Sequence, residues 1–127
     1  MKVFYIYNER IGTRPAMRTG HNNHHTLAVE RHPVAAVGVE VVNGVVNTQF
    51  AVCSPKDNFN RRIARQIVSG RMAKNPIMTI NGNIQQVFKD NNVFIKQKNV
   101  DWTRASKMFG ETISDIVQTQ IKTNTQA

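Results

Sequence analysis

The chain has 127 residues, the length of one domain, and can bury a substantial core. It carries 17 Lys and Arg residues against 8 Asp and Glu, a formal net charge of +9. Forty per cent hydrophobic residues exclude wholesale disorder, and the single cysteine excludes a disulfide framework or a zinc site with two thiolates. No apolar run approaches the roughly 18 residues of a membrane span. We expect one soluble intracellular domain, residues 1–127, whose positive field favours a nucleotide or a nucleic acid.

The N-terminal part predicts two strands separated by a long loop. Residues 2–7 are aromatic and β-branched, which is typical of a strand, and residues 26–31 predict a second one. Residues 8–25 contain glycines, a proline, three histidines and three arginines, and we expect a functional or mobile loop there.

A β-hairpin is the clearest structural signal in the sequence. The runs 34–42 and 45–53 flank Asn43-Gly44, a dipeptide that suits the positive φ angles of a two-residue hairpin turn. This turn pairs Val42 with Val45 and fixes the register of both strands. One face then carries the apolar residues, which we expect to face the core: Ala35, Val37, Val39, Val41, Val46, Thr48, Phe50 and Val52.

Two main helices are predicted, over residues 55–69 and 101–121. Ser54 can cap the first, Pro55 suits its first turn, and Gly70 can end it. Its buried stripe is expected at i, i+4 and i+8, the positions of Phe59, Ile63 and Ile67.

The second main helix starts after Asp101, which can cap it, and Gly110 in its middle allows a close contact. Residues 77–98 predict short strands with turns, of which 93–96 is the best. Together these elements predict an α+β fold: an antiparallel sheet built on the hairpin and packed by the two helices.

The first predicted helix is also the main candidate for binding. Arg61, Arg62 and Arg65 share one side of it, Lys56 lies in its first turn, and Arg71 follows its end. No Glu is interleaved with them at the spacing that would pair their charges. Arginine suits phosphate because its planar fork donates two hydrogen bonds at once. A solvated helix face is the alternative interpretation.

Other candidates are weaker. The histidines of residues 21–25 could bind a metal only on a helix, which Gly20 and two asparagines disfavour, so no metal site is expected. Phe94, and Trp102 with Arg104 nearby, could stack on a base and hold its phosphate, although both aromatics are more often core residues. Cys53 could be a nucleophile before a helix, but a small strand residue is far commoner. The eight carboxylates form no acid/base pair, so we expect a binding protein without cofactor rather than an enzyme.

Residues 53–72, CSPKDNFNRRIARQIVSGRM, resemble a pattern of small phage-encoded proteins, C-x-P-x-D-x-F-x-[KR]-x-x-x-R-x-I-x-x-G-R. The sheet-then-helices order is similar to the phage Thoeris anti-defence sponges. That family sequesters cyclic ADP-ribose isomers, and its members are oligomers with ligand pockets between sheet and helices. The match covers about 20 residues of the chain and departs at Ala64, where the pattern often has Gly.

The resemblance implies a sponge in the cytoplasm of an infected bacterium that holds a nucleotide signal without turnover, as a dimer or higher homo-oligomer. Arg61, Arg65 and Arg71 would neutralise a pyrophosphate, with Lys56 and Arg104 as further cations. Phe94 or Trp102 would stack on adenine, and Asn60 or Asn92 would read its edge. Two alternatives remain open: a small basic phage nucleic-acid-binding protein, and an inhibitor that masks a host enzyme.

Overall fold

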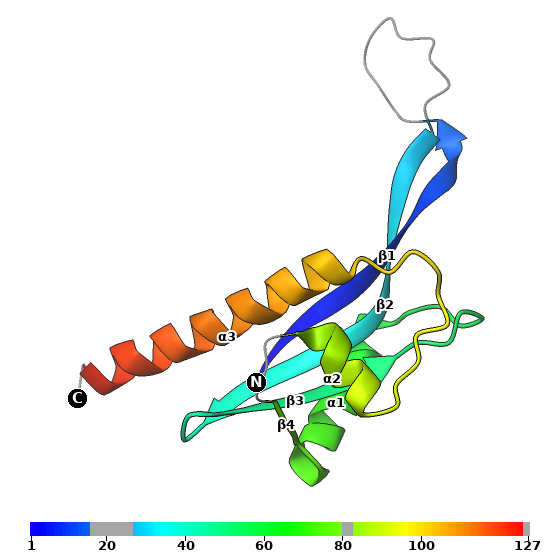
Figure 1. Ribbon diagram of the computed structural model, residues 1–127. Coiled ribbons are helices and arrows are strands. Elements are labelled where there is room, and N and C mark those ends of the chain that lie inside the picture. Colours follow the sequence, from blue (N-terminus) through cyan, green and yellow to red (C-terminus); the bar gives the residue numbers. More distant parts are fainter. Residues whose placement is uncertain (16–26, 80–82, 126–127) are drawn as a thin grey trace, which may run out of the picture.

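The computed structural model describes residues 1–15, 27–79 and 83–125, with side chains except those of 10–15, 27–30 and 123–125. Within these ranges four strands form one antiparallel sheet in the order β1-β2-β3-β4. The strands are β1 (Lys2–Pro15), β2 (Leu27–Val42), β3 (Val45–Val52) and β4 (Ile77–Thr79), and the helices are α1 (Arg61–Lys74), α2 (Ile84–Asp90) and α3 (Trp102–Thr125). The expected α+β class is confirmed (Figure 1). The predicted histidine loop, residues 21–25, lies outside the described residues.

The predicted hairpin is confirmed in its turn and its register. Asn43 and Gly44 have φ angles of 51° and 76°, as a turn with two left-handed residues requires. Val42 pairs with Val45, and the ladder continues without a shift to Ala35 opposite Val52.

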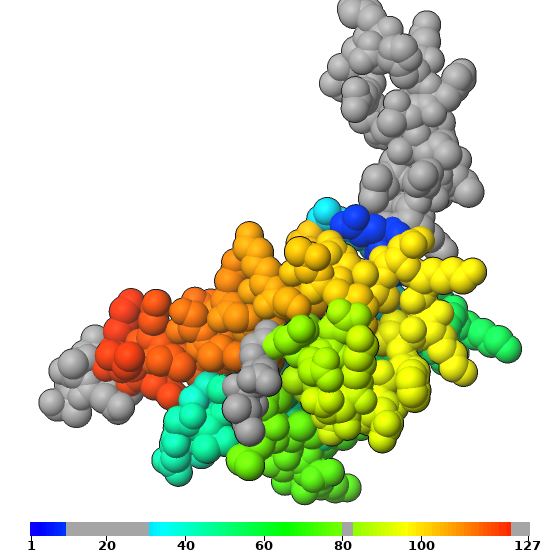
Figure 2. Space-filling view, viewed as in Figure 1, coloured from blue at the N-terminus to red at the C-terminus, as the bar shows by residue number. Residues whose placement is uncertain are grey.

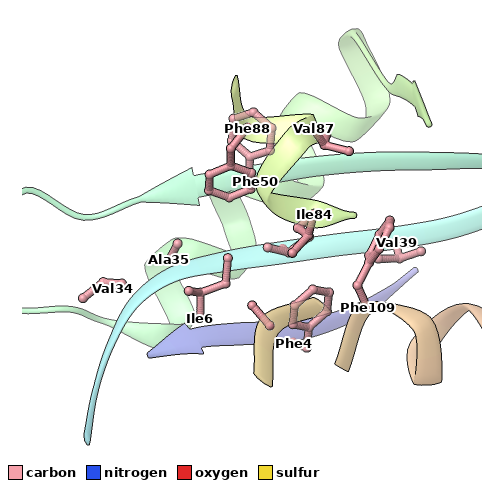
Figure 3. Packing of buried hydrophobic residues seen from close by; sticks show 12 residues of the cluster. Phe4, Ile6, Val34, Ala35, Val39, Phe50, Ile84, Val87, Phe88 and Phe109 are labelled. Atoms are coloured by element: carbon pink, nitrogen blue, oxygen red, sulfur yellow. The ribbon is translucent and has the colours of Figure 1, made fainter. Parts of the chain in front are cut away.

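The predicted core face of the hairpin is buried beneath α2 and α3. Phe50 lies against Phe88 of α2, with ring centroids 4.6 Å apart, and Phe4 of β1 lies against Phe109 of α3 at 6.2 Å (Figure 3). The space-filling view in Figure 2 shows α2, α3 and the chain between them covering this side of the sheet. Aromatic and branched side chains from three strands and two helices therefore build the larger core.

The opposite face of the sheet lies against α1, and small residues form the centre of this contact. Ala36 and Ala51 are buried there against Ala64 and Val68 of the helix. Gly38 lies beneath α1 so closely that a Cβ atom at this position would overlap Val68 Cγ1. The absence of a side chain at Gly38 thus sets how near the helix can approach the sheet.

The predicted start and buried stripe of the first helix are wrong. Asn60 rather than Ser54 is the N-cap, and its side chain accepts a hydrogen bond from the backbone N–H of Ile63 at 3.1 Å. Residues 54–57 instead form a turn, closed by a bond from the N–H of Asp57 to the Ser54 carbonyl. The helix buries Ala64, Val68 and Met72. Ala64 and Val68 face Ala36 and Ala51, where the small residues of the sheet allow a close approach.

Ile63 and Ile67 are consequently 53% and 40% exposed. The helix also runs through Gly70 to Lys74, so Gly70 does not end it as predicted.

Three other predicted elements differ from the structure. Residues 8–15, expected as loop, continue β1, which pairs with β2. The described part of the second predicted strand, 27–31, and the run 34–42 belong to one strand rather than two. Residues 84–90, expected among short strands, form α2, and 93–96 is not a strand. The capping role of Asp101 is confirmed, because its side chain accepts from the N–H of Arg104 at 3.0 Å. Gly110 makes no close contact with the rest of the described chain.

Candidate phosphate-binding groove

Arginines of α1 and tyrosines of β1 face each other at matched spacing. Tyr5 and Tyr7 are two residues apart on the strand, a rise of roughly 6.7 Å. Arg61 and Arg65 are four apart on the helix, a rise of about 6 Å on nearly the same side. These two periods match, so each arginine meets its own tyrosine.

The contacts follow this geometry. Arg61 Nη2 donates to the Tyr7 hydroxyl at 3.1 Å, and Arg65 Nε donates to the Tyr5 hydroxyl at 2.9 Å. The Arg61 guanidinium also lies over the Tyr5 ring, 4.8 Å from its centroid, and Phe59 supports that ring edge-on at 5.9 Å. The two guanidinium groups are therefore held at fixed positions although both side chains are exposed.

A third arginine reaches the same place from the other side of the sheet. Arg104, in the first turn of α3, lies over the Tyr7 ring at 5.6 Å from its centroid. Arg61 of α1 and Arg104 of α3 therefore both contact Tyr7, although the two helices lie on opposite faces of the sheet. The structure thus brings together three of the predicted binding residues, Arg61, Arg65 and Arg104.

A shallow groove runs between α1 and β1 along this row of side chains. It consists of two adjoining hollows of about 550 and 560 Å³ that share Arg65 and Gln66. We call it the α1–β1 groove; its lining residues are Met1, Lys2, Val3, Tyr5, Arg61, Arg62, Arg65, Gln66 and Ser69. Among these described residues there are four cations and no carboxylate.

No carboxylate of the described side chains forms an ion pair with these arginines. The two ion pairs among described side chains join Glu9 to Arg31 and Lys107 to Glu111, and neither involves the groove. A phenol hydroxyl accepts a hydrogen bond without adding a negative charge. The tyrosines therefore orient the guanidinium groups and leave their charge available to an anion.

Arg71 does not belong to this groove. It follows Arg65 by six residues, which turns it about 240° around the helix. Its Nη1 donates to the backbone carbonyl of Phe50 at 2.8 Å. Phe50 follows the residues of β3 that pair with β4, so its carbonyl is open to this bond. Gln49 makes a second link there, from Nε2 to the carbonyl of Asn75 at 2.6 Å. Arg71 thus ties the end of α1 to β3, two strands away from the tyrosines.

The remaining predicted residues are not drawn into the groove. Lys56 is exposed in the turn before α1, and the Asn60 side chain is used as a helix cap. Trp102 is half-buried with its ring edge-on to Phe88 at 5.5 Å, so it belongs to the core.

Asn92 and Phe94 lie in the chain after α2. Their neighbours Asn91 and Val93 line a hollow beside β3 together with Arg71, and Phe94 itself is 79% exposed. Asn92 has a left-handed φ of 56°, which suits the turn that follows the helix. These two residues therefore lie on the β3 side of the sheet, away from the α1–β1 groove.

A further hollow of about 600 Å³ lies where β1, the turn after β3 and residues 96–99 meet. Its wall includes Lys96, Lys98 and the amide side chains of Asn8 and Gln97. Asn8 Oδ1 and Gln97 Oε1 are buried and have no hydrogen-bond partner among the described residues.

Cys53 lies at the edge of that hollow, and its environment disfavours a nucleophile. Its Sγ is 3.5 Å from the carbonyl oxygens of Ser54 and Asp57. Burial, and secondarily the charge of Asp57, raise the pKa of the Cys53 thiol, which lowers its thiolate fraction near neutral pH. Among the described residues no cluster of His, Cys, Asp and Glu could hold a metal ion.

Comparison of the chain with protein-family models, curated proteins and solved structures finds no match. In the described ranges, no helix combines the length and the apolar character that crossing a membrane requires.

Sequence reasoning missed the two tyrosines as site residues. Both were visible as alternate positions of the first strand, and alternation places them on one face. The sequence contains no signal that this face would meet the arginine side of α1, because that contact depends on how the helix crosses the sheet.

Proposed function

We propose that this protein binds nucleic acid through its phosphate backbone at the α1–β1 groove. The observation that carries the proposal is the row of exposed arginines, Arg61, Arg62, Arg65 and Arg104, of which three are oriented by tyrosines and none is paired with a carboxylate among the described residues. Unpaired like charges held on one surface repel each other, and a polyanion relieves this repulsion.

The length of the groove supports a polymer rather than a single phosphate. From Arg61 to Ser69 the helix rises about 12 Å. Phosphates of one strand of B-form DNA rise about 3.4 Å along the axis but lie roughly twice as far apart along the backbone, so a groove of this length that follows the backbone reaches about two to three of them. The groove is shallow and its lining is basic along its length, as a backbone-tracking surface requires. Such a polymer is present in the cytoplasm of an infected bacterium, the expected location.

A binding assay with alanine variants of cations inside and outside the groove tests this proposal. The affinity for fluorescently labelled DNA, measured by anisotropy at low salt, is compared among the wild type, Arg61→Ala/Arg65→Ala and Lys107→Ala. Lys107 is an exposed cation of α3 that is paired with Glu111 at 3.9 Å, so its loss serves as the control. We expect the double variant to lose at least about tenfold in affinity and the control to bind like the wild type. Unchanged binding by the double variant would refute the proposal.

A second candidate is sequestration of a small nucleotide, as the resemblance implies. The hollow lined by Asn8, Gln97, Lys96 and Lys98 favours it, because its volume of about 600 Å³ lies within the range of small-molecule sites. The two lysines that line it could meet a phosphate there. A thermal-shift screen with mononucleotides and cyclic nucleotides separates the candidates: a discrete stabilising ligand that Lys96→Ala/Lys98→Ala abolishes would support the sponge.

A further inference from the structure

The rings of Tyr5, in the groove, and of Tyr7, beside it, are already occupied. The Arg61 guanidinium lies over Tyr5, whose ring also meets Phe59, and the Arg104 guanidinium lies over Tyr7. A base could stack on either ring only by displacing an arginine that the same ring orients.

This occupancy disfavours a single strand as the bound polymer. Proteins that hold single strands combine a positive groove with open aromatic rings, and each stacked base contributes about 1–3 kcal/mol. Among the described residues the strongly exposed aromatic side chain is that of Phe94. Phe94 lies on the β3 side of the sheet, whereas the groove follows β1, so its ring is not available to a polymer bound in the groove. The groove therefore offers charge without a stacking platform, which suits a backbone whose bases are paired with each other.

The long β1–β2 ribbon points to the same class of polymer. The β2–β3 ladder ends at Ala35, whereas β1 and β2 remain paired as far as Pro15 and Leu27. Figure 1 shows this pair of strands rising away from the sheet as an arm. The arm begins beside Tyr7 and so leaves the domain next to the arginines of the groove.

The dimensions of the arm favour DNA over RNA. Two paired strands lie about 4.8 Å apart, and the major groove of B-form DNA, about 12 Å wide, admits such a ribbon. The major groove of an RNA duplex is deep and narrow and does not.

We infer, on the basis of the proposed function, that the bound polymer is double-stranded DNA, held by its backbone in the α1–β1 groove while the β1–β2 arm enters the major groove. The arginines contact phosphates and the tyrosines act as positioning residues, which hold the guanidinium groups without contacting the DNA bases.

Competition among three polymers of one sequence tests the inference. Duplex DNA, single-stranded DNA and duplex RNA compete with a labelled DNA duplex for the full-length protein at one salt concentration. We expect duplex DNA to compete about tenfold better than the single strand, which finds no open ring to stack on, and about tenfold better than duplex RNA, whose major groove is too narrow for the arm. Equal or better competition by the single strand or by duplex RNA would overturn the inference.

Two further measurements separate stacking and groove choice. Phe94→Ser, a change at a side chain that is 79% exposed, is expected to leave binding of all three polymers unchanged. Weaker binding of single strands by this variant would show that bases stack on Phe94 and would contradict the inference. Methyl green, which occupies the major groove, is expected to displace the protein from duplex DNA. If distamycin, a minor-groove ligand, displaces the protein and methyl green does not, the placing of the arm in the major groove is wrong.

The failures of the two proposals are distinguishable. If none of the three polymers binds, or if Arg61→Ala/Arg65→Ala binds as the wild type does, the proposed function itself is wrong. If binding depends on these arginines but favours single strands or RNA, the proposed function holds and the duplex-DNA inference is wrong.

Discussion

Replacing Gly38 with alanine tests how closely α1 lies on the sheet. The new Cβ would overlap Val68 Cγ1 and lie 2.9 Å from Met1 Sδ. Met1 can move because its side chain is 51% exposed and flexible, whereas Val68 is fully buried and stiff at χ1. Overpacking of this kind destabilises by about 1–3 kcal/mol, and the Gly-to-Ala change recovers about 0.4–1 kcal/mol through the unfolded chain. We expect a net loss of about 1–2 kcal/mol.

A double-mutant cycle with Val68→Ala shows whether this overlap is the cause. Val68→Ala alone removes two buried carbons and should cost about 2–3 kcal/mol. In Gly38→Ala/Val68→Ala the alanine methyl occupies part of the vacated space, so the combined loss should fall at least about 1 kcal/mol short of the sum. Urea unfolding followed by circular dichroism measures all three variants. Gly110→Ala, where a Cβ meets nothing within 4 Å, is the control and should gain stability. Additive losses, or a neutral Gly38→Ala, would refute this account of the α1–sheet contact.

Three other changes have defined outcomes. Arg71→Ala should lower the free energy of unfolding by about 1–2 kcal/mol, because the Phe50 carbonyl loses its charged donor. The DNA affinity of this variant should equal that of the wild type. A loss of affinity at equal stability would place Arg71 in the binding site. Thr48→Val should raise stability by about 1 kcal/mol in thermal unfolding, because the buried Thr48 hydroxyl has no partner among the described residues, and a destabilised variant would mean that it has one. The raised pKa of Cys53 predicts slower alkylation by iodoacetamide at pH 8 than for a free cysteine, with a rate that levels off only above the ordinary thiol pKa. Reaction as fast as that of the free amino acid would contradict that shift.

The parts of the fold that the sequence predicted correctly are those that local chemistry determines. Asn43-Gly44 needs no tertiary partner to form its turn, and the alternation beside it assigns one face to the core. Asp101 caps α3 by a hydrogen bond to a residue three positions away.

The errors arise where a local signal was ambiguous or a distant partner decided. Ser54 could cap a helix by itself, but α1 is capped by Asn60. A helix that begins there can place its own small residues against Ala36 and Ala51 of the sheet. The apolar positions of α2 follow a helical period, yet seven residues are too few to separate a helix from short strands.

The same distinction applies to the candidate site. The unpaired arginines on one side of α1 were visible in the sequence, and the structure shows Arg61 and Arg65 exposed together. Their tyrosine partners are 54 and 60 residues away in the chain, so only the packing of α1 across the sheet could reveal them. Arg71 was grouped with them by proximity in sequence, although the helical turn carries it to the opposite flank.

The salt dependence of duplex-DNA binding tests the central claim most directly. A contact with a phosphate by each of Arg61, Arg62, Arg65 and the neighbouring Arg104 predicts that log K falls with log salt at a slope of about −3.6, and the loss of Arg61 and Arg65 should reduce the slope to about −1.8. Lys107→Ala should keep the wild-type slope. An equal slope for the wild type and Arg61→Ala/Arg65→Ala would show that these arginines release no counterions on binding, which would contradict a phosphate-binding groove between α1 and β1.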